Sequence, residues 1–188
     1  MRKIGVYGGT FDPIHHGHLI LARQALESLG LEKVIFVPAA SSPFKGPPAT
    51  SGETRLSMLQ AAIANETAFA TDDCELRRPP PSYTIDTVEE IRSREKAAEI
   101  CLLVGEDNVA SLPKWRRFDE LQKLVRFVVL DRTGSDKEGD YEVVRRKIDI
   151  SGTEIRERVA SGRSIRYLVP AAVEEIIRQN NLYRESGK

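Results

Sequence analysis

A segment near the N-terminus, residues 8–18, contains residue types that suit phosphate chemistry. Its sequence is GGTFDPIHHGH, with two consecutive glycines at the start and three histidines at the end. It follows a short strand-like run and precedes residues 19–29, whose apolar side chains recur at helical spacing. Glycines in such a turn let backbone N–H groups approach a ligand, and the helix start adds unpaired N–H groups and a positive dipole end. We therefore predict a nucleotide-phosphate site at which chemistry takes place.

The histidines of this segment allow three interpretations. His15 and His18 are three residues apart and share one face of a helical turn, which favours phosphate ligands at the helix N-terminus. A capped helix start with ordinary surface imidazoles would explain one histidine better than two. Two histidines without a nearby carboxylate or cysteine form a poor zinc ligand set, so we expect no metal site. His16 is expected to face elsewhere.

A second helix start lies near the C-terminus, at Ser151-Gly152-Thr153-Glu154. Its S-x-x-E pattern is a capping box, which explains Ser151 and Glu154 structurally. The capping box does not explain Thr153 or Arg156. A hydroxyl and a guanidinium at a helix start can bind a β- or γ-phosphate, and a capped helix start is still an anion site.

Composition narrows the class of protein. At 188 residues we expect a single domain spanning residues 1–188. The 28 basic and 28 acidic residues balance, which disfavours nucleic-acid and membrane-surface partners. Cys74 and Cys101 lie in apolar strand-like runs, as buried free thiols do. We see no signal-peptide region and no apolar run of bilayer length, so we expect a cytoplasmic protein, either monomeric or a homo-oligomer.

Strand-like and helical segments alternate along the chain. After the first strand and helix, we expect strands at 34–37, 69–76, 100–104 and 127–130, and helices at 53–65, near 84–94 and after Ser151 and Pro170. This alternation predicts an α/β fold: a Rossmann-like parallel sheet with helices on both faces and a small C-terminal helical subdomain. Ligands should gather beyond the carboxyl ends of the strands, where residues 8–18, 41–45 and 105–107 are expected.

Several motifs together resemble one family. Gly8-Gly9-Thr10-Phe11-Asp12-Pro13 and His15-His16-Gly17-His18 are similar to the signature of the nucleotidyltransferase α/β-phosphodiesterase superfamily. Within it, nearly the whole chain resembles the bacterial nicotinate-nucleotide adenylyltransferases. The supporting motifs are Ser82-Tyr83-Thr84, Gly105-Glu106-Asp107-Asn108, Leu112-Pro113-x-Trp115, Ile150-Ser151-Gly152-Thr153-Glu154-Ile155-Arg156 and Gly162–Pro170. They occur in the order found in the family.

The resemblance implies adenylyl transfer from ATP to nicotinic acid mononucleotide, with Mg²⁺ carried by the ATP. His15, His18, Lys45 and Arg156 are the expected catalytic residues. Asp107 could bind a ribose hydroxyl or simply form a turn. The full set expected to bind ATP is Gly8, Gly9, Thr10, Phe11, His15, His18, Gly105, Asp107, Ser151, Thr153 and Arg156.

On the acceptor side, the resemblance implies that Trp115 stacks on the pyridine ring, although a single tryptophan is by default a core anchor. Tyr83 and Thr84 could meet the nicotinate carboxylate or only cap a helix. Arg132 is a candidate for the mononucleotide phosphate, and Asp12 is placed on the same side.

One loop departs from the family pattern. Where the family has Pro-Pro-His-Lys, this chain has Ser42-Pro43-Phe44-Lys45, so any hydrogen bond from that histidine is absent. Lys45 keeps its place and is expected to contact phosphate, although a solvated loop lysine is the simpler interpretation.

The sequence does not decide between the acid and the amide, nicotinamide mononucleotide, as the pyridine acceptor, and two other functions remain open. Pantetheine-phosphate adenylyltransferase shares the opening signature, but it is not expected to contain Ser82-Tyr83-Thr84 or the segment 112–115. A non-catalytic dinucleotide-binding module, or a dehydrogenase domain, is the alternative from a different class. The glycine turn is not G-x-G-x-x-G, which counts against that alternative.

Overall fold

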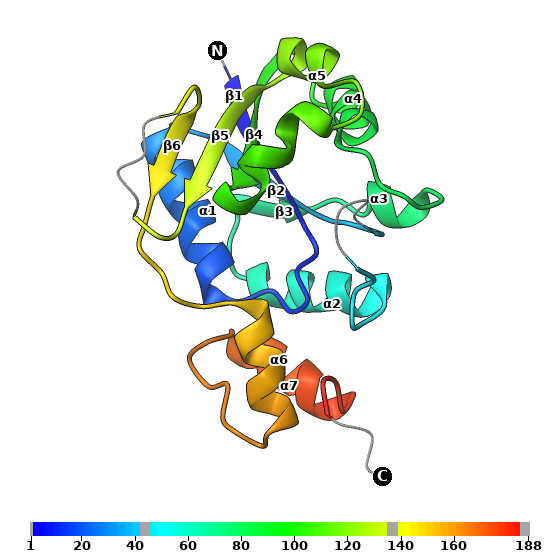
Figure 1. Ribbon diagram of the computed structural model, residues 1–188, viewed down its shortest axis with the longest axis vertical. Coiled ribbons are helices and arrows are strands. Elements are labelled where there is room, and N and C mark those ends of the chain that lie inside the picture. Colours follow the sequence, from blue (N-terminus) through cyan, green and yellow to red (C-terminus); the bar gives the residue numbers. More distant parts are fainter. Residues whose placement is uncertain (1, 42–45, 135–138, 185–188) are drawn as a thin grey trace.

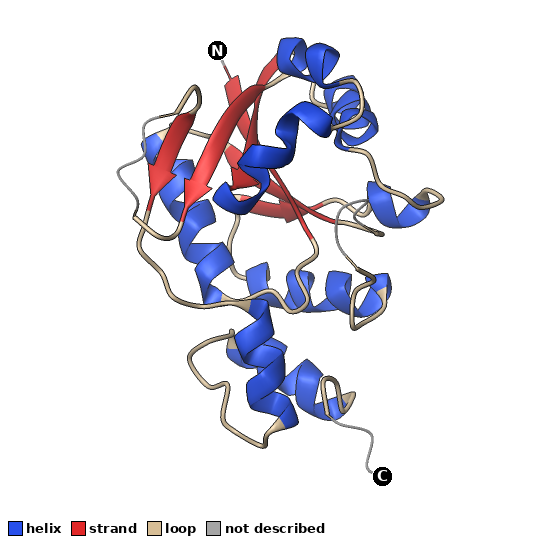
Figure 2. Cartoon of the chain, viewed as in Figure 1, coloured by secondary structure: helices blue, strands red, loops and turns tan. Residues whose placement is uncertain are grey.

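The computed structural model describes residues 2–41, 46–134 and 139–184. Its six strands are all parallel and lie in the order β3-β2-β1-β4-β5-β6 (Figures 1 and 2). Their bounds are β1 Arg2–Gly9, β2 Lys33–Pro38, β3 Phe69–Thr71, β4 Ala98–Gly105, β5 Arg126–Asp131 and β6 Glu142–Arg145. The predicted Rossmann-like parallel sheet is confirmed.

The strand order reverses between β1 and β4, and this point positions the site. The two strands are adjacent, with Tyr7 opposite Leu103, but the chain leaves β1 toward β2 and leaves β4 toward β5. Connections therefore diverge and open a crevice at the carboxyl ends of β1 and β4. The segment that begins at Gly8 and the segment that begins at Gly105 both enter that crevice.

Helices cover both faces of the sheet (Figure 2). Their bounds are α1 His16–Ser28, α2 Gly52–Ile63, α3 Cys74–Arg77, α4 Thr84–Arg94, the 3₁₀ helix η1 Glu106–Lys114, α5 Phe118–Leu124, α6 Gly152–Ala160 and α7 Ala171–Gln179. Among the described residues, no helix combines the length and the apolar character needed to cross a membrane.

Alternating side chains of the strands divide the core into two clusters. In β1, Ile4 and Val6 pack with α4 and α5, whereas Tyr7 packs with α1 and α2 on the opposite face. The second of these clusters continues into α7 through Val173 and Ile177, which lie on one side of that helix. The small C-terminal helical subdomain is therefore joined to the sheet through α2, as Figure 1 shows at its lower end.

Some sequence predictions of local structure were wrong. Residues 69–76 were expected to form one strand, but the strand ends at Thr71 and Cys74–Arg77 is helical. Asp72 Oδ1 accepts a hydrogen bond from the Cys74 N–H (3.0 Å), and this local side-chain bond starts the turn. The strand β6 and the helices η1 and α5 were not predicted. The last helix begins at Ala171, directly after Pro170.

Candidate active site

The β1–α1 turn brings two histidine rings together at the crevice. His15 is the N-cap of α1, and its backbone N–H donates to Nδ1 of His18 (3.3 Å). The rings stack with their centroids 3.7 Å apart and their planes 25° from parallel. Because Nδ1 of His18 accepts a hydrogen bond, a neutral His18 carries its proton on Nε2. His16 instead donates its backbone N–H to the Leu168 carbonyl (2.9 Å).

His15 is held in its neutral form by burial. Its side chain is 4% exposed, and burial, followed by the nearby Arg132 charge, lowers the pKa of His15 to about 3. Its Nδ1 has no hydrogen-bond partner within the described residues. The ring lies over Gly17, where an added Cβ would be 3.0 Å from His15 Cε1 and Nδ1. A glycine at position 17 thus makes room for the histidine pair.

Aromatic rings pack against the β1–α1 turn. Phe11 has a left-handed backbone (φ 49°), and its ring lies 5.1 Å from His18 and 5.5 Å from Tyr7, measured between centroids. An added Cβ at Gly9 would approach Phe11 Cζ to 2.9 Å. Because Gly9 has no side chain, its backbone can pack directly against the Phe11 ring. The backbone of Gly9 thus lies at the edge of the crevice.

The start of α6 faces this turn across the crevice. Ser151 Oγ accepts from the Glu154 N–H (3.1 Å), which is the predicted cap. Arg156 donates to Thr153 Oγ1 (3.2 Å) and to the backbone carbonyl of Asp12 (2.7 Å). The Arg156 guanidinium is thus held by hydrogen bonds to both the β1–α1 turn and α6. The start of α6 therefore combines a capped N-terminus with a positive charge.

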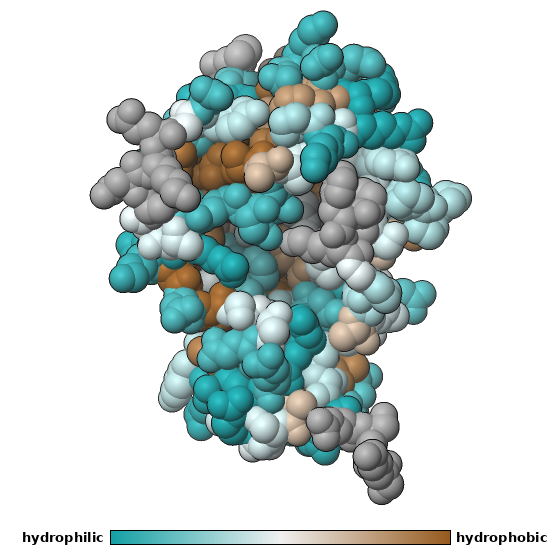
Figure 3. All heavy atoms as spheres, in the orientation of Figure 1, coloured by the Kyte–Doolittle hydropathy of each residue, from teal (hydrophilic) through white to brown (hydrophobic). Residues whose placement is uncertain are grey.

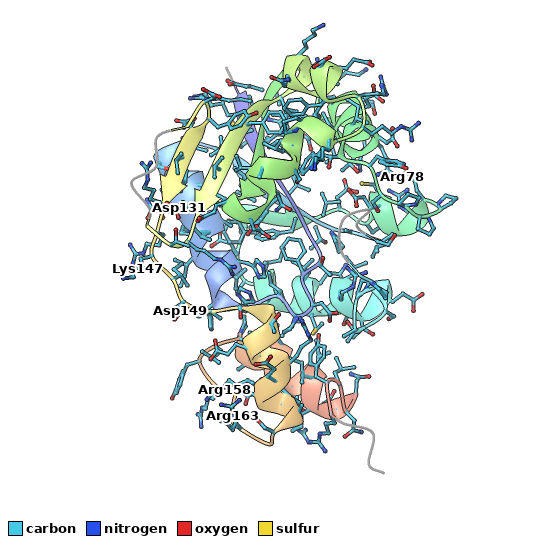
Figure 4. The ribbon with its side chains drawn as sticks, in the orientation of Figure 1. Arg78, Asp131, Lys147, Asp149, Arg158 and Arg163 are labelled. Carbon is cyan, nitrogen blue, oxygen red and sulfur yellow. The ribbon has the colours of Figure 1, made fainter. Side chains whose placement is uncertain are left out.

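A cavity of about 700 Å³ lies between these elements. Figure 3 shows the molecule hollowed near its centre, between the sheet and the helices below it. Asp131, labelled in Figure 4 at the end of β5, fixes the turn that carries Arg132. Its Oδ1 accepts from Thr133 N–H (2.8 Å) and Gly134 N–H (3.0 Å). The cavity is lined by every residue expected to bind ATP, namely Gly8, Gly9, Thr10, Phe11, His15, His18, Gly105, Asp107, Ser151, Thr153 and Arg156.

A second cavity, of about 350 Å³, adjoins the first. Tyr83, Thr84 and Trp115 line it, and they are the residues expected to meet the pyridine ring and its carboxylate. Trp115 is half-buried and donates its indole N–H to Ser111 Oγ (3.3 Å). The Arg116 guanidinium lies 4.6 Å from the centroid of the Tyr83 ring, a cation–π contact.

The start of α4 forms one wall of this second cavity. No side chain caps its N-terminus at Tyr83, so its first N–H groups suit an anion. Lys114 and Arg116 add positive charge to the lining. The buried carboxyl group of Glu75 is also part of it, and burial raises the pKa of Glu75.

The two cavities share the end of β1. Gly8, Gly9 and Thr10 line both of them, as does Asn108 from η1. A molecule in each cavity would therefore meet at the glycine edge, beside the histidine pair. Such an arrangement can hold two nucleotides with their phosphates in contact.

Three of the predicted site residues do not lie in the cavity assigned to their substrate or lie outside the described residues. Arg132 and Asp12 were expected on the acceptor side, and both line the larger cavity. The carboxylate of Asp12 is 7% exposed and accepts hydrogen bonds from Ala49, Thr50 and Tyr183. Lys45 lies outside the described residues.

Sequence reasoning missed other lining residues. Lys114 and Arg116 flank Trp115, and two basic residues around a loop tryptophan were the available signal. Ile148 and Ile150 line the larger cavity from the segment before α6, and Glu75 lines the smaller one. The two isoleucines look like core residues in the sequence, and nothing in the sequence around Glu75 indicates that it lies at a cavity.

These features are those of a nucleotidyltransferase: a parallel sheet with a crevice at the carboxyl ends of β1 and β4, a histidine pair on one side of it and a second, cationic helix start on the other. Accordingly, the model of the cytidylyltransferase-like family matches residues 6–158. Within that class, the chain belongs to the nicotinate-nucleotide adenylyltransferase family. It is 43% identical to the Shouchella clausii protein named "Probable nicotinate-nucleotide adenylyltransferase", with 100% of both chains covered. A relative of the same name from Gemmatimonas aurantiaca is also 43% identical, over 97% of this chain and 93% of its own length.

A solved structure has a similar fold. It is the nicotinic acid mononucleotide adenylyltransferase of Plasmodium falciparum in complex with NaAD, with a TM-score of 0.81. The match covers 97% of this chain and 98% of that one, at 19% identity. At this identity the likeness concerns the arrangement of the strands and helices.

Proposed function

We propose that this protein transfers the adenylyl group of ATP to nicotinic acid mononucleotide, forming nicotinic acid adenine dinucleotide and pyrophosphate. The observation that carries the proposal is the pair of cavities that meet at Gly8–Thr10. One is lined by histidines and the α6 start, and the other by an aromatic side chain and an uncapped helix start. Full-length relatives of the adenylyltransferase family support the same activity.

The reaction needs positioning more than proton transfer. A phosphate oxygen of the acceptor is already anionic and attacks the α-phosphorus of ATP, forming a new P–O bond. The bond between the α-phosphorus and the bridging oxygen breaks, and its electron pair leaves with pyrophosphate. No general base is required, so catalysis consists of alignment and stabilisation of the charge on the leaving group.

The described residues are suited to these two tasks. We assign His18, as an Nε2–H donor, and the neutral His15 to the α-phosphate. Arg156 and Thr153 are assigned to the leaving pyrophosphate, because they approach the cavity from the opposite side. Lys45 is assigned to the same phosphates from the segment outside the described residues.

Mg²⁺ enters this scheme with the substrate. Within the described residues, no group of three or more histidine, cysteine, aspartate or glutamate side chains could hold a metal ion. We therefore propose that the ATP phosphates and water supply most of its ligands.

The charge of the smaller cavity favours an acid over an amide. Lys114, Arg116 and the N-terminus of α4 bring positive charge to this cavity, while burial raises the pKa of Glu75, the acidic residue among its described lining residues, so a pyridine carboxylate gains more there than a neutral carboxamide. Arg132 would meet the phosphate of the acceptor from the larger cavity. Trp115 would stack on the pyridine ring.

The decisive experiment measures pyrophosphate release from ATP with three separate acceptors. Nicotinate mononucleotide should support the fastest release, nicotinamide mononucleotide a slower one, and phosphopantetheine none. A preference for phosphopantetheine would identify a different adenylyltransferase. ATP binding without release, whichever acceptor is added, would favour the non-catalytic binding module.

A variant of His18 tests the mechanism. His18→Ala removes a preorganised donor, so we expect turnover to fall by at least ~10²-fold while ATP affinity changes less. Steady-state and binding measurements on the same preparation would show both. His16→Ala is the matched control, because His16 lies next to the pair but lines neither cavity. Near-normal turnover of His18→Ala would contradict the assignment.

A further inference from the structure

The C-terminal segment after α7 reaches back to the β1–α1 turn through one tyrosine. The Tyr183 hydroxyl donates a hydrogen bond to Asp12 Oδ1 (2.5 Å), although the two residues are 171 positions apart. Burial raises the pKa of Tyr183, so the phenol remains a donor at neutral pH. Its backbone is left-handed (φ 58°), a conformation that tyrosine adopts only where the surroundings hold it.

The carboxylate of Asp12 accepts hydrogen bonds from two segments that are far apart in the sequence. Its Oδ2 accepts from the backbone N–H groups of Ala49 (2.6 Å) and Thr50 (3.2 Å). Its Oδ1 accepts from Thr50 Oγ1 (2.8 Å) as well as from Tyr183. Four donors from two separate segments therefore fix a buried carboxylate within the β1–α1 turn.

The main chain of Asp12 contacts the opposite wall of the larger cavity. Its carbonyl oxygen accepts a hydrogen bond from Arg156 Nη1 (2.7 Å). Gly152, the first residue of α6, comes so close that an added Cβ would lie 3.3 Å from that oxygen. One residue thus links Tyr183, through its side chain, to the guanidinium of Arg156, through its backbone.

Buried Arg55 of α2 also holds the β1–α1 turn in place through hydrogen bonds. It donates to the Thr10 carbonyl (2.8 Å) and to the Thr50 carbonyl (3.3 Å). The carbonyl groups on either side of Phe11 therefore accept from two arginines, one in α2 and one in α6. Little movement of Asp12 is available without disturbing Arg156.

We infer that Tyr183 is a positioning residue for adenylyl transfer: its hydroxyl orients Asp12, and Asp12 aims Arg156 at the leaving phosphates. The inference rests on the proposed function for its reaction, but the contacts themselves do not. Arg156, the residue through which Tyr183 acts, is assigned to the leaving pyrophosphate and does not line the smaller cavity. The effect should therefore appear on the ATP side of the reaction and not on the acceptor side.

The test is Tyr183→Phe, which removes the hydroxyl and keeps the ring. We expect kcat/KM for ATP to fall between about 10-fold and 10²-fold, with the acceptor KM unchanged. Tyr167→Phe is the matched control, because Tyr167 belongs to the same C-terminal region and is also left-handed (φ 68°) but is 79% exposed. It should behave as wild type.

A double-mutant cycle with Arg156→Lys separates positioning from simple stabilisation. If Tyr183 acts through Arg156, the combined loss should be smaller than the product of the single losses by about threefold or more. Independent effects would multiply, and that result would overturn the inference. An equal loss in Tyr167→Phe, or a rise in the acceptor KM matching that for ATP, would also overturn it.

Two further measurements keep the test decisive. Thr50→Val removes the other side-chain donor to Asp12 Oδ1, so it carries the same cycle if Tyr183→Phe does not fold, and Thr50→Ser should restore activity. ATP dissociation constants, measured by calorimetry without acceptor, give the coupling independently of turnover. A wild-type protein that releases no pyrophosphate would remove the proposed function, while coupling in ATP binding would still decide the role of Tyr183.

Discussion

Burial makes the two stacked imidazoles at this site unequal. His15 is almost fully enclosed and stays neutral, while His18, one turn further on, orders its tautomer by accepting the His15 backbone N–H. A pair of positive imidazoles 3.7 Å apart would repel one another. Keeping His15 neutral therefore allows the pair to stack while both rings line the same cavity.

The pKa of His15 has a consequence for stability. In the unfolded chain His15 titrates near its ordinary value of 6.5, but in the folded protein near 3. Between these values only the unfolded chain binds the proton, so the free energy of unfolding should fall by up to ~1.4 kcal/mol for each pH unit below 6.5. Above that pH the contribution is constant.

Urea unfolding between pH 4 and 8 would measure this loss. His15→Gln is the control, because glutamine has no proton to gain and carboxylates elsewhere affect both proteins alike. The wild-type stability should decrease more steeply than that of His15→Gln as the pH falls. Parallel curves throughout would show that His15 is not held neutral.

Two helix starts, α1 and α6, form the opposite walls of the larger cavity. The first turn of each helix lines that cavity, and each of these turns contains a glycine. Gly17 makes room for the His15 ring, and Gly152 for the Asp12 carbonyl. Close approach of neighbouring atoms, rather than an unusual backbone angle, explains both glycines.

Gly17→Ala should therefore separate stability from activity. Alanine favours the helix by about 1 kcal/mol, but its Cβ would force the His15 ring to move from a 3.0 Å contact. We expect the melting temperature to be kept and kcat to fall by about 10-fold or more. Gly139→Ala is the control, because a Cβ there meets nothing within 4 Å. Unchanged turnover in Gly17→Ala would show that the ring tolerates displacement.

At the scale of the molecule, the C-terminal helices share a core with the sheet. Ile177 of α7 lies in the same cluster as Met58 and Leu59 of α2 and Tyr7 of β1. The other face of the sheet packs a separate cluster against which Trp115 rests. Because the same strands carry both clusters, we propose that the described chain unfolds as one cooperative domain.

Ile177→Ala tests this cooperativity. Loss of a fully buried isoleucine should reduce the free energy of unfolding by ~2–5 kcal/mol, and Trp115 fluorescence and far-ultraviolet circular dichroism should report one coincident transition. Ile20→Ala, at a side chain 39% exposed, should have little effect. A Trp115 transition that stays at the wild-type position would show that α6 and α7 fold as a separate unit.

The local sequence predicted where strands and helices occur better than it predicted the residues at which they end. Apolar runs such as 100–104 and 127–130 form strands as expected, because a buried strand needs continuous apolar residues. The strand β6 was missed, since an edge strand of only Glu142–Arg145 has two charged ends and little apolar content. Within 69–76 the apolar pattern was a poor guide, because one aspartate hydrogen bond redirected the backbone.

The sequence by itself determined the fold class and the capped start of α6, and it predicted phosphate chemistry at the β1–α1 turn, because each follows from residues close together in the chain. Only the tertiary structure decided which segments face one another. Asp12 bonds to Arg156 and to Tyr183, which are 144 and 171 positions away. Arg132 lines the larger cavity and Glu75 the smaller. Such contacts depend on how the packed sheet brings distant segments together, and no local pattern of residue types records that.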